Sequence, residues 1–519
     1  MADVCTGRGQ SGSCHNTAAA LASALGHSAA LVPAPTNETA LRRIIPICLA
    51  ALLAMPASAQ LDLSLPAIGD PAAETMTRGQ EERLGREMMT EVRRRLPLLD
   101  DPEVNSYLRD LGARLAARAP DPGFDFHFFV VEDPRINAFA MPGGYIGVHT
   151  GLILNARTES QLAGVVAHEI AHVTQRHLAR RLQASQGLSL RTAALVLAGI
   201  LLGTQNPQAG SAATVGALAS QVQSELSYSR NHEREADRIG LQILASAGLD
   251  PAGMAEFFDI LLRASRYRDA PPAFLSTHPL TEARVAEGRA GAERYPAGSV
   301  FESPDFQFAR ARALVLSTGS PAQAVEMLRT RLEERPAAAP RWASRYGLAL
   351  AMSADERHAE AEELLRELLA EQGEHASLII ARAVNHSRAG RHEQALETIE
   401  EAASLFPDDY AVQFRRIEVL LDAGRSAQAA RRASEAGHRY PAEPALQQLR
   451  ARAADANGDT AEAALAMGQY YALLGDFASA LNQARRVLEQ NRADEYQRSR
   501  ASALQERWRQ ALEATRQDS

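Results

Sequence analysis

The spacing of apolar residues changes character near residue 303. Before this point, short apolar runs of different period alternate with turns, whereas after it a helical period continues to the end of the chain. The change predicts two domains, over residues 81–302 and 303–519, after a Pro/Gly-punctuated flexible lead-in over residues 60–80. We therefore expect a mainly α-helical protein, with a mixed α+β first domain and an all-helical second domain.

A small sheet is expected inside the first domain. Two helices, separated by Pro97 and Pro102, precede it between residues 81 and 118. Alternating apolar residues and a Pro-Gly-Gly turn then predict three extended segments, at residues 124–130, 137–141 and 145–149. A further helix should begin at Thr158, because Gln161 follows it at the spacing of a capping box.

Three markers recur every 34 residues in the second domain. They are the alanines, glycines and prolines at Ala361, Ala395, Ala429 and Ala463, at Gly390, Gly424 and Gly458, and at Pro407 and Pro441. This period, with small residues at the turns and Pro after the second helix, is typical of tetratricopeptide repeats. Each helix pair buries its apolar face only by stacking on its neighbours, which predicts an α-solenoid that folds without the first domain.

Charge and cysteine content narrow the chemistry. The 55 basic and 63 acidic residues give a net charge of −8, so the chain has no basic field for a nucleic-acid backbone, and we expect no nucleic-acid partner. All three cysteines lie at or before Cys48. A metal site further along the chain must therefore use His and carboxylate ligands.

The helix predicted to begin at Thr158 carries the sequence His168-Glu169-Ile170-Ala171-His172. Residues at positions i and i+4 share one helix face, so both imidazoles can reach one zinc ion at about 2.1 Å. Glu169 lies beside them and could take a proton from the attacking water. Two histidines on a solvated face with a chance Glu would give the same pattern, so the assignment depends on a third ligand.

Glu233 and Asp237 also share one face of a helix, which opens after Tyr228. A ligating carboxylate with a second carboxylate one turn further suits a zinc site, because the second can orient a ligating His. In the alternative, this is an exposed helix end in which the carboxylates pair with the neighbouring cations, Arg230, Arg234 and Arg238. The upstream histidine pair favours the metal site.

The order of these motifs, followed by Ser276-Thr277-His278-Pro279, resembles that of the M48 family of zinc metallopeptidases, here with C-terminal tetratricopeptide repeats. The resemblance implies a zincin-like catalytic domain with one zinc ion per chain. It implies His168, His172 and Glu233 as zinc ligands and Glu169 as general base. It also implies a substrate-facing edge strand formed by Asn137, Ala138, Phe139 and Ala140.

Three further histidines lie near these motifs. His278 lies in a Pro-flanked segment that is expected to be an exposed loop before a helix capped by Thr281. It could stabilise the oxyanion with help from Arg284, act as a fourth zinc ligand that keeps the enzyme latent, or serve only in helix capping; we favour the latent form. His177 and His232 lie off the ligand spacing and are expected to be exposed and not to bind metal.

The N-terminus has the features of an export signal. Arg42-Arg43, the apolar run from Ile44 to Met55 and an Ala-x-Ala site predict a signal peptide within residues 1–59, cleaved after Ala59, and a wrongly chosen start codon would explain its long upstream extension. A second apolar run, Thr192–Gly203, is also too short to span a bilayer. It is expected to be a lid or membrane-surface helix, which would give peripheral membrane contact, or simply part of the core.

Signal peptide and family resemblance together predict a zinc-dependent endopeptidase of the periplasm. The resemblance implies quality control or assembly of outer-membrane proteins, with unfolded or stalled outer-membrane proteins as clients. It also implies the outer-membrane barrel assembly machinery as a partner of the repeats. Two other functions remain open: a mainly non-proteolytic chaperone or scaffold that uses the solenoid, and a zinc hydrolase of cell-wall peptides.

Overall fold

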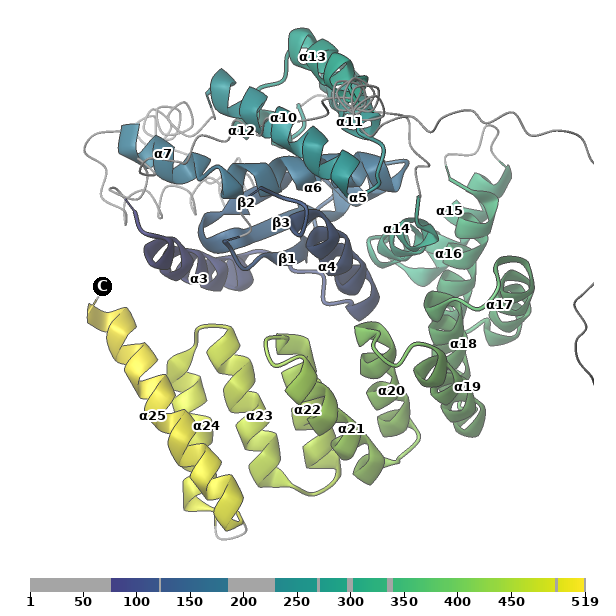
Figure 1. The fold of residues 1–519 in the computed structure, drawn as a ribbon. Coiled ribbons are helices and arrows are strands. Elements are labelled where there is room, and N and C mark those ends of the chain that lie inside the picture. Colours follow the sequence, from purple (N-terminus) through teal and green to yellow (C-terminus); the bar gives the residue numbers. More distant parts are fainter. Residues whose placement is uncertain are drawn as a thin grey trace, which may run out of the picture. The chain divides into compact units, whose positions relative to one another are not determined.

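The structure of the 519-residue chain is a computed structural model, shown in Figure 1. It describes residues 76–120, 123–184, 229–267, 271–295, 302–333, 339–490 and 493–517, all within the compact unit Gly69–Ser519. The predicted signal peptide, most of the lead-in and the apolar run Thr192–Gly203 lie outside these residues. Within them, no helix combines the length and apolarity needed to cross a membrane.

The predicted sheet is present and has three strands. They are β1 (His127–Val131), β2 (Ala138–Met141) and β3 (Tyr145–His149), in the spatial order β1-β3-β2. β1 runs parallel and β2 antiparallel to the central β3, so β2 is an edge strand. Between β2 and β3, the short 3₁₀ helix η1 (Pro142–Gly144) makes the turn, with Gly143 and Gly144 at φ angles of 72° and 84° that favour glycine.

In the described part of the chain, the first domain has nine helices besides η1. They are α3 (Arg78–Arg95), α4 (Pro102–Ala116), α5 (Thr150–Asn155), α6 (Glu159–Thr174), α7 (His177–Ala184), α10 (Arg230–Ser246), α11 (Ala252–Tyr267), α12 (Phe274–Thr277) and α13 (Glu282–Ala292). α6 is central, because it packs against the sheet on one side and against α10 and α11 on the other (Figure 1). All residues of α6 are buried.

Helix α6 begins where the sequence predicts, with Thr158 as its N-cap. The Thr158 side chain accepts a hydrogen bond from the backbone N–H of Gln161, as in a capping box. The Gln161 side chain accepts instead from the backbone N–H of Arg157, one residue before the cap. Close packing along α6 requires Gly164, where a Cβ atom would lie 2.8 Å from the Cα atom of Met254 in α11.

The second domain is the expected stack of helix pairs. Its helices are α14 (Pro304–Leu316), α15 (Pro321–Glu333), α16 (Arg341–Ala354), α17 (His358–Gln372), α18 (Ala376–Arg388), α19 (His392–Leu405), α20 (Tyr410–Asp422), α21 (Ser426–Arg439), α22 (Pro444–Ala456), α23 (Thr460–Leu473), α24 (Phe477–Glu489) and α25 (Glu495–Gln517). The repeating glycines Gly390, Gly424 and Gly458 follow helices with φ angles of 71°, 68° and 80°. The fold class is therefore confirmed.

Helix α14 contributes to both domains. Phe306, Ala309 and Ala313 belong to the same hydrophobic core as the sheet and α6, whereas Phe308 and Ala311 pack with α16 and α18. Just before α14, the Glu302 carboxylate accepts hydrogen bonds from two backbone N–H groups at the start of α6. The boundary at residue 303 stays a prediction, since α14 shares the core of the first domain.

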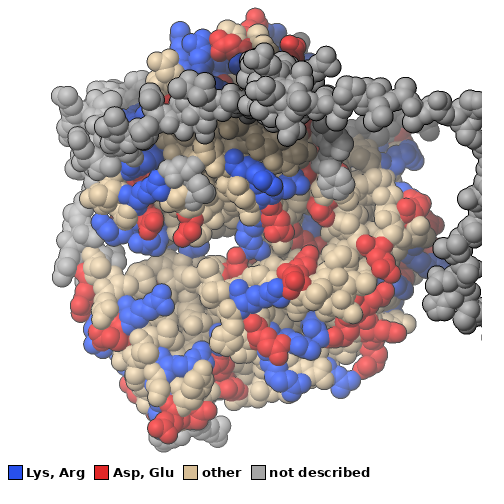
Figure 2. Space-filling model, viewed as in Figure 1, with Lys and Arg blue, Asp and Glu red and all other residues tan. Residues whose placement is uncertain are grey.

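A buried ion cluster also joins the two domains. Asp101 caps α4 and accepts two hydrogen bonds of 2.8 Å from Arg312 in α14 and one of 3.0 Å from Arg415 in α20. Glu103, also in α4, forms ion pairs with the same two guanidinium groups. Elsewhere on the visible surface, basic and acidic residues are interspersed (Figure 2).

Candidate metal centre

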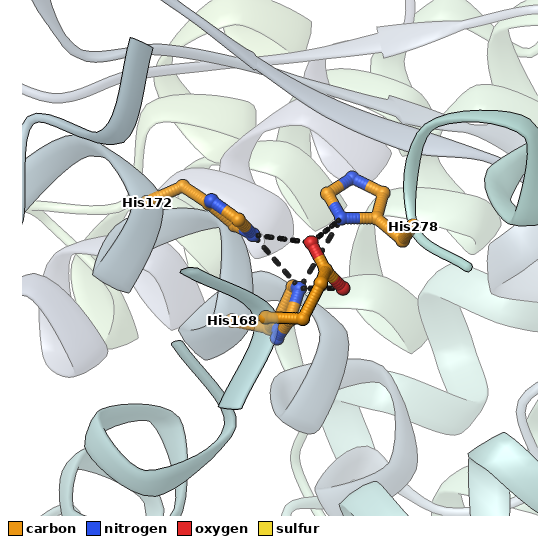
Figure 3. Close-up of side chains that lie close together, drawn as sticks. His168, His172 and His278 are labelled. Atoms are coloured by element: carbon orange, nitrogen blue, oxygen red, sulfur yellow. Dashed lines mark hydrogen bonds and ion pairs between the residues drawn. The ribbon is translucent and has the colours of Figure 1, made fainter. Parts of the chain in front are cut away.

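Four buried side chains from three segments of the first domain converge on one point. They are His168 and His172 from α6, Glu233 from α10 and His278 from the residue after α12, and each has a donor atom within 4.8 Å of the others. Figure 3 shows the three imidazoles turned toward one another. Each of the four residues is at most 2% exposed. The sequence predicted the first three members as ligands, and the structure brings them together.

The spacing of the donor atoms suits a zinc ion. The Nε2 atom of His168 lies 3.0 Å from Nε2 of His172 and 3.3 Å from Nδ1 of His278. The Oε1 atom of Glu233 lies 3.4 Å from His172 and 3.1 Å from His278. Ligands at about 2.1 Å from a tetrahedral zinc are separated by roughly 3.4 Å. Nitrogen donors with one carboxylate are also the ligand types that zinc selects.

Glu169 lies beside this cluster without being one of its converging donors. It is 0% exposed, and neither of its carboxylate oxygens has a hydrogen-bond partner in the described chain. Burial raises the pKa of Glu169, and this effect opposes the influence of His278, whose Nε2 lies 3.4 Å away. A buried carboxylate whose oxygens make no hydrogen bond is costly for stability, so its presence here favours a functional role.

Asp237 and Arg284 form the outer support of the cluster. Asp237 Oδ1 lies 3.0 Å from Nδ1 of His168, and both Asp237 oxygens accept hydrogen bonds from Arg284, at 2.9 and 2.8 Å. Arg284 also lies 2.6 Å from Glu233 Oε2. Burial alone would raise the pKa of Asp237, but His168 and Arg284 lower it. Asp237 therefore remains an anion behind the metal-facing histidine.

The alternative of an exposed, charge-laced helix end is wrong. The ion pairs with Glu233 and Asp237 come from Arg284 of α13. Among the described ion pairs, none joins either carboxylate to the three neighbouring arginines of α10. Arg234 instead pairs with Glu287 at the surface. The sequence could not distinguish the two arrangements, because the partner comes from a distant helix.

The expected exposure of His278 is also wrong. Its side chain is 1% exposed and stacks on the ring of Phe274, with ring centroids 4.4 Å apart. Thr281 does cap the next helix, α13, as predicted. The His278 imidazole lies in the cluster and takes no part in that cap, so helix capping does not explain its position. Its catalytic or latent role stays a prediction.

Two histidines expected at the surface lie inward. His177 is 0% exposed, and its Nδ1 atom lies 2.9 Å from Nδ1 of His172. His232 is half-buried and stacks on His177, with ring centroids 4.5 Å apart. Neither is among the converging donors, so their assignment as non-ligands agrees with the geometry. The sequence carried no sign of the burial of His177.

The predicted substrate strand is the edge strand β2 with the residue before it. Asn137, Ala138 and Phe139 are at most 8% exposed, and the Asn137 amide nitrogen lies 3.4 Å from Nε2 of His149. Helix α6, which carries His168, Glu169 and His172, packs against β2, so the strand lies beside the cluster. Among the described residues, no strand pairs with the outer edge of β2. Substrate binding at this backbone edge, rather than through these side chains, stays a prediction.

Comparisons with known proteins agree with this geometry. Residues 102–290 match peptidase family M48, and residues 387–453 match the tetratricopeptide repeat. The chain is 41% identical over 332 residues to the putative beta-barrel assembly-enhancing protease of Vibrio cholerae, an alignment that covers 64% of this chain and 68% of that protein. It is 39% identical over 315 residues to the beta-barrel assembly-enhancing protease of Escherichia coli, covering 61% of this chain and 64% of that protein.

A more distant relative matches a shorter stretch of the chain. The mitochondrial metalloendopeptidase OMA1 of Arabidopsis thaliana is 32% identical over 182 residues, which is 35% of each chain. The alignments with the two bacterial proteins span about two thirds of their length. By these matches the chain belongs to peptidase family M48, as a metalloendopeptidase whose catalytic domain precedes tetratricopeptide repeats.

Proposed function

We propose that this protein is a zinc-dependent endopeptidase of the periplasm that acts in the assembly and quality control of outer-membrane proteins. The observation that carries the proposal is the convergence of His168, His172 and Glu233 beside the buried carboxylate of Glu169, whose oxygens make no hydrogen bond in the described chain. The names of the bacterial relatives support the link to outer-membrane protein assembly. The predicted signal peptide supports the location.

Each residue of the site has a separate role in this proposal. A single zinc ion, when bound by His168, His172 and Glu233, would act as a Lewis acid that polarises the scissile carbonyl and lowers the pKa of the attacking water. Glu169 accepts the proton of the attacking water and later delivers it to the leaving amine. Asp237 and Arg284 hold the ligands in place from behind.

Substrate recognition would use the free edge of β2. An extended peptide can add to an edge strand through backbone hydrogen bonds, which place little demand on its sequence. Such binding selects segments that are not yet paired in a sheet. Unfolded or stalled outer-membrane proteins, whose barrels consist of strands, present such segments. The barrel assembly machinery would then dock on the repeats.

His278 would hold the resting enzyme latent. A catalytic zinc needs one ligand position open for substrate. The Nδ1 atom of His278, which lies among the donors of the other three residues, would fill it. A role as oxyanion donor would require the imidazole to withdraw from these donors. The arrangement therefore favours a fourth ligand that must move before catalysis.

The test compares purified wild type with Glu169→Gln and with Glu287→Gln, a surface variant of the same domain. We expect wild type and Glu287→Gln to cleave casein and an unfolded outer-membrane protein, and Glu169→Gln to bind zinc normally without cleavage. Equal cleavage by Glu169→Gln would refute the proposed mechanism. Full complementation in cells by Glu169→Gln would favour the chaperone or scaffold, and cleavage of purified muropeptides would favour the cell-wall hydrolase.

A further inference from the structure

His177 occupies a position behind the metal cluster that its place in the sequence does not suggest. In an uninterrupted helix, a residue five positions after His172 would point about 140° away from it. Instead, α6 ends, and Arg176 adopts a left-handed conformation with φ of 51°. This turn brings His177, the first residue of α7, back against the ring of His172.

Arg176 is held in this unusual conformation by buried contacts. Its guanidinium donates hydrogen bonds of 2.8 and 2.6 Å to Glu81 of α3 and a further one to the backbone carbonyl of Met76. A left-handed conformation is unfavourable for a residue other than glycine and persists where surrounding contacts enforce it. The turn that aims His177 at His172 is therefore built into the fold.

The two ligating histidines have the same orientation. In each, Nε2 faces the cluster and Nδ1 faces outward. Behind His168, the outward nitrogen faces the carboxylate of Asp237. Behind His172, the outward nitrogen faces Nδ1 of His177 at 2.9 Å. A ligating histidine usually donates this outward N–H to a fixed acceptor, and that acceptor controls the tautomer and the orientation of the ring.

Metal binding through Nε2 of His172 determines where the protons lie along the described contacts of His172, His177 and Glu235. His172 then carries its proton on Nδ1, so Nδ1 of His177 must be the acceptor. The proton of His177 consequently sits on Nε2, which lies 3.1 Å from Glu235 Oε2. Glu235 is held in turn by Arg180 at 3.0 Å. The stacked ring of His232 covers one face of His177.

We propose that His177 is a positioning residue of the zinc site. Its Nδ1 accepts a hydrogen bond from the outward N–H of His172, and its own ring is fixed by Glu235. This inference rests on the proposed function, because it assumes that the cluster binds zinc. His177 and Asp237 then perform the same task for the two histidines of α6, one as a neutral imidazole and the other as a carboxylate. Loss of such a partner typically weakens metal binding 10–100-fold.

The test measures the zinc dissociation constant of the full-length protein by competition with a chromophoric chelator. His177→Asn places an amide oxygen near the position of Nδ1 and can still accept from His172. His177→Gln reaches the position of Nε2 and keeps only the contact with Glu235. His177→Leu keeps neither contact. We expect zinc affinity close to wild type for Asn, and 10–100-fold weaker binding for Gln and Leu.

The order of these three variants separates positioning from packing. A residue that only fills space would tolerate Leu best and Asn worst, so that order would overturn the proposal. Zinc binding by His177→Leu within threefold of wild type would also overturn it. The melting temperature of each metal-free variant identifies any that fails to fold, and the shift on zinc addition gives a second measure that does not depend on proteolysis.

Two further variants complete the design. Glu235→Leu should weaken zinc binding less than His177→Leu, and the double variant should be no worse than His177→Leu alone, because both act through one contact. Independent, additive effects would contradict this. His386→Leu removes a buried histidine of the repeat domain and should leave zinc affinity unchanged. If wild type itself binds no zinc, the proposed function fails, whereas wild-type binding with an unaffected His177→Leu refutes only this inference.

Discussion

The carboxylate of Asp237 lies 3.0 Å from Nδ1 of His168, on the side of the imidazole opposite to the nitrogen that faces Glu233. The carboxylate is itself held by the guanidinium of Arg284 through two hydrogen bonds. Three helices, α6, α10 and α13, thus determine the orientation of one ligating ring. This arrangement explains why the acidic motif contains two carboxylates one helical turn apart, of which only one faces the metal position.

Asp237→Asn should therefore weaken zinc binding without abolishing it. The amide keeps the shape of the carboxylate but lacks its charge, and its oxygen cannot serve both His168 and Arg284 fully. We expect roughly tenfold lower zinc affinity, measured by chelator competition. Asp259→Asn, which changes a half-buried carboxylate paired with Arg289, is the control and should bind zinc as wild type does. Unchanged affinity in Asp237→Asn would contradict the orienting role.

Removal of a zinc ligand should weaken zinc binding more than removal of the residue that orients the ligand. His168→Ala, His172→Ala and Glu233→Ala should each be purified with little zinc, whereas Glu169→Gln should retain about one zinc ion per chain. Metal content by inductively coupled plasma mass spectrometry checks both statements. Stoichiometric zinc in all three ligand variants would show that the cluster is not the metal site.

The direction in which His278→Ala changes casein cleavage distinguishes the two proposed roles of His278. If His278 keeps the enzyme latent, His278→Ala should raise basal casein cleavage severalfold and weaken zinc binding somewhat. If it stabilises the oxyanion, the same change should lower turnover by about 10²-fold with zinc retained. His127→Ala, an exposed histidine of β1, serves as the control. Unchanged cleavage together with unchanged zinc affinity would exclude both roles.

Much of this site could be predicted from local spacing. His168 and His172 converge because four residues make about one helical turn, and the third ligand was predicted from the acidic motif. The strand Tyr145–His149 has the predicted bounds, because an apolar alternation and a Pro-Gly-Gly turn delimit it. In contrast, the strand predicted from residue 124 begins only at His127.

The errors arose where distant segments determine a residue's surroundings. His278 is buried because Phe274 and the cluster cover it, although the adjacent prolines suggested an exposed loop. His177 is buried because Arg176 reverses the chain without a Gly or Pro to mark the end of the helix. Contacts with Glu81, almost 100 residues earlier, hold that reversal, and no local pattern encodes them.

The buried ion cluster between the domains should make stability depend on pH. Burial alone would raise the pKa of Asp101, but Arg312 and Arg415 lower it to about 2. A carboxylate whose pKa is lower in the folded protein than in the unfolded chain stabilises the fold above the unfolded value. That stability is lost as the pH falls from about 4 toward 2.

Asp101→Asn should therefore reduce the free energy of unfolding by about 3 kcal/mol at neutral pH, because it leaves two buried guanidinium groups poorly paired. The difference in free energy of unfolding between the variant and wild type should become smaller below about pH 4, where the wild-type carboxylate becomes protonated. Urea unfolding of both proteins over this pH range checks the prediction. Since burial raises the pKa of the neighbouring Glu103, the difference between the two proteins, and not the wild-type curve alone, reports on Asp101. A difference that stays constant to pH 2 would contradict the assignment.

The two faces of α14 provide a test of how far the repeat domain is independent. We expect residues 303–519 to give a helical circular-dichroism spectrum and a cooperative melt, since each helix pair stacks on the next. In the full chain, Phe306 is 1% exposed in the catalytic core, and Phe308 is 2% exposed against α16 and α18. Truncation of either phenylalanine should destabilise the domain that buries it by 3–5 kcal/mol, on the order of other core Phe→Ala changes.

Isolation of the repeats separates these two effects. Without the catalytic domain, Phe306 has lost its partners, so Phe306→Ala should leave the melting temperature of the fragment 303–519 nearly unchanged. Phe308→Ala should lower it, because the partners of Phe308 in α16 and α18 remain. In the full chain, both changes should be destabilising. A fragment that is disordered, or one in which Phe306→Ala is as harmful as Phe308→Ala, would show that the repeats do not keep this fold without the catalytic domain.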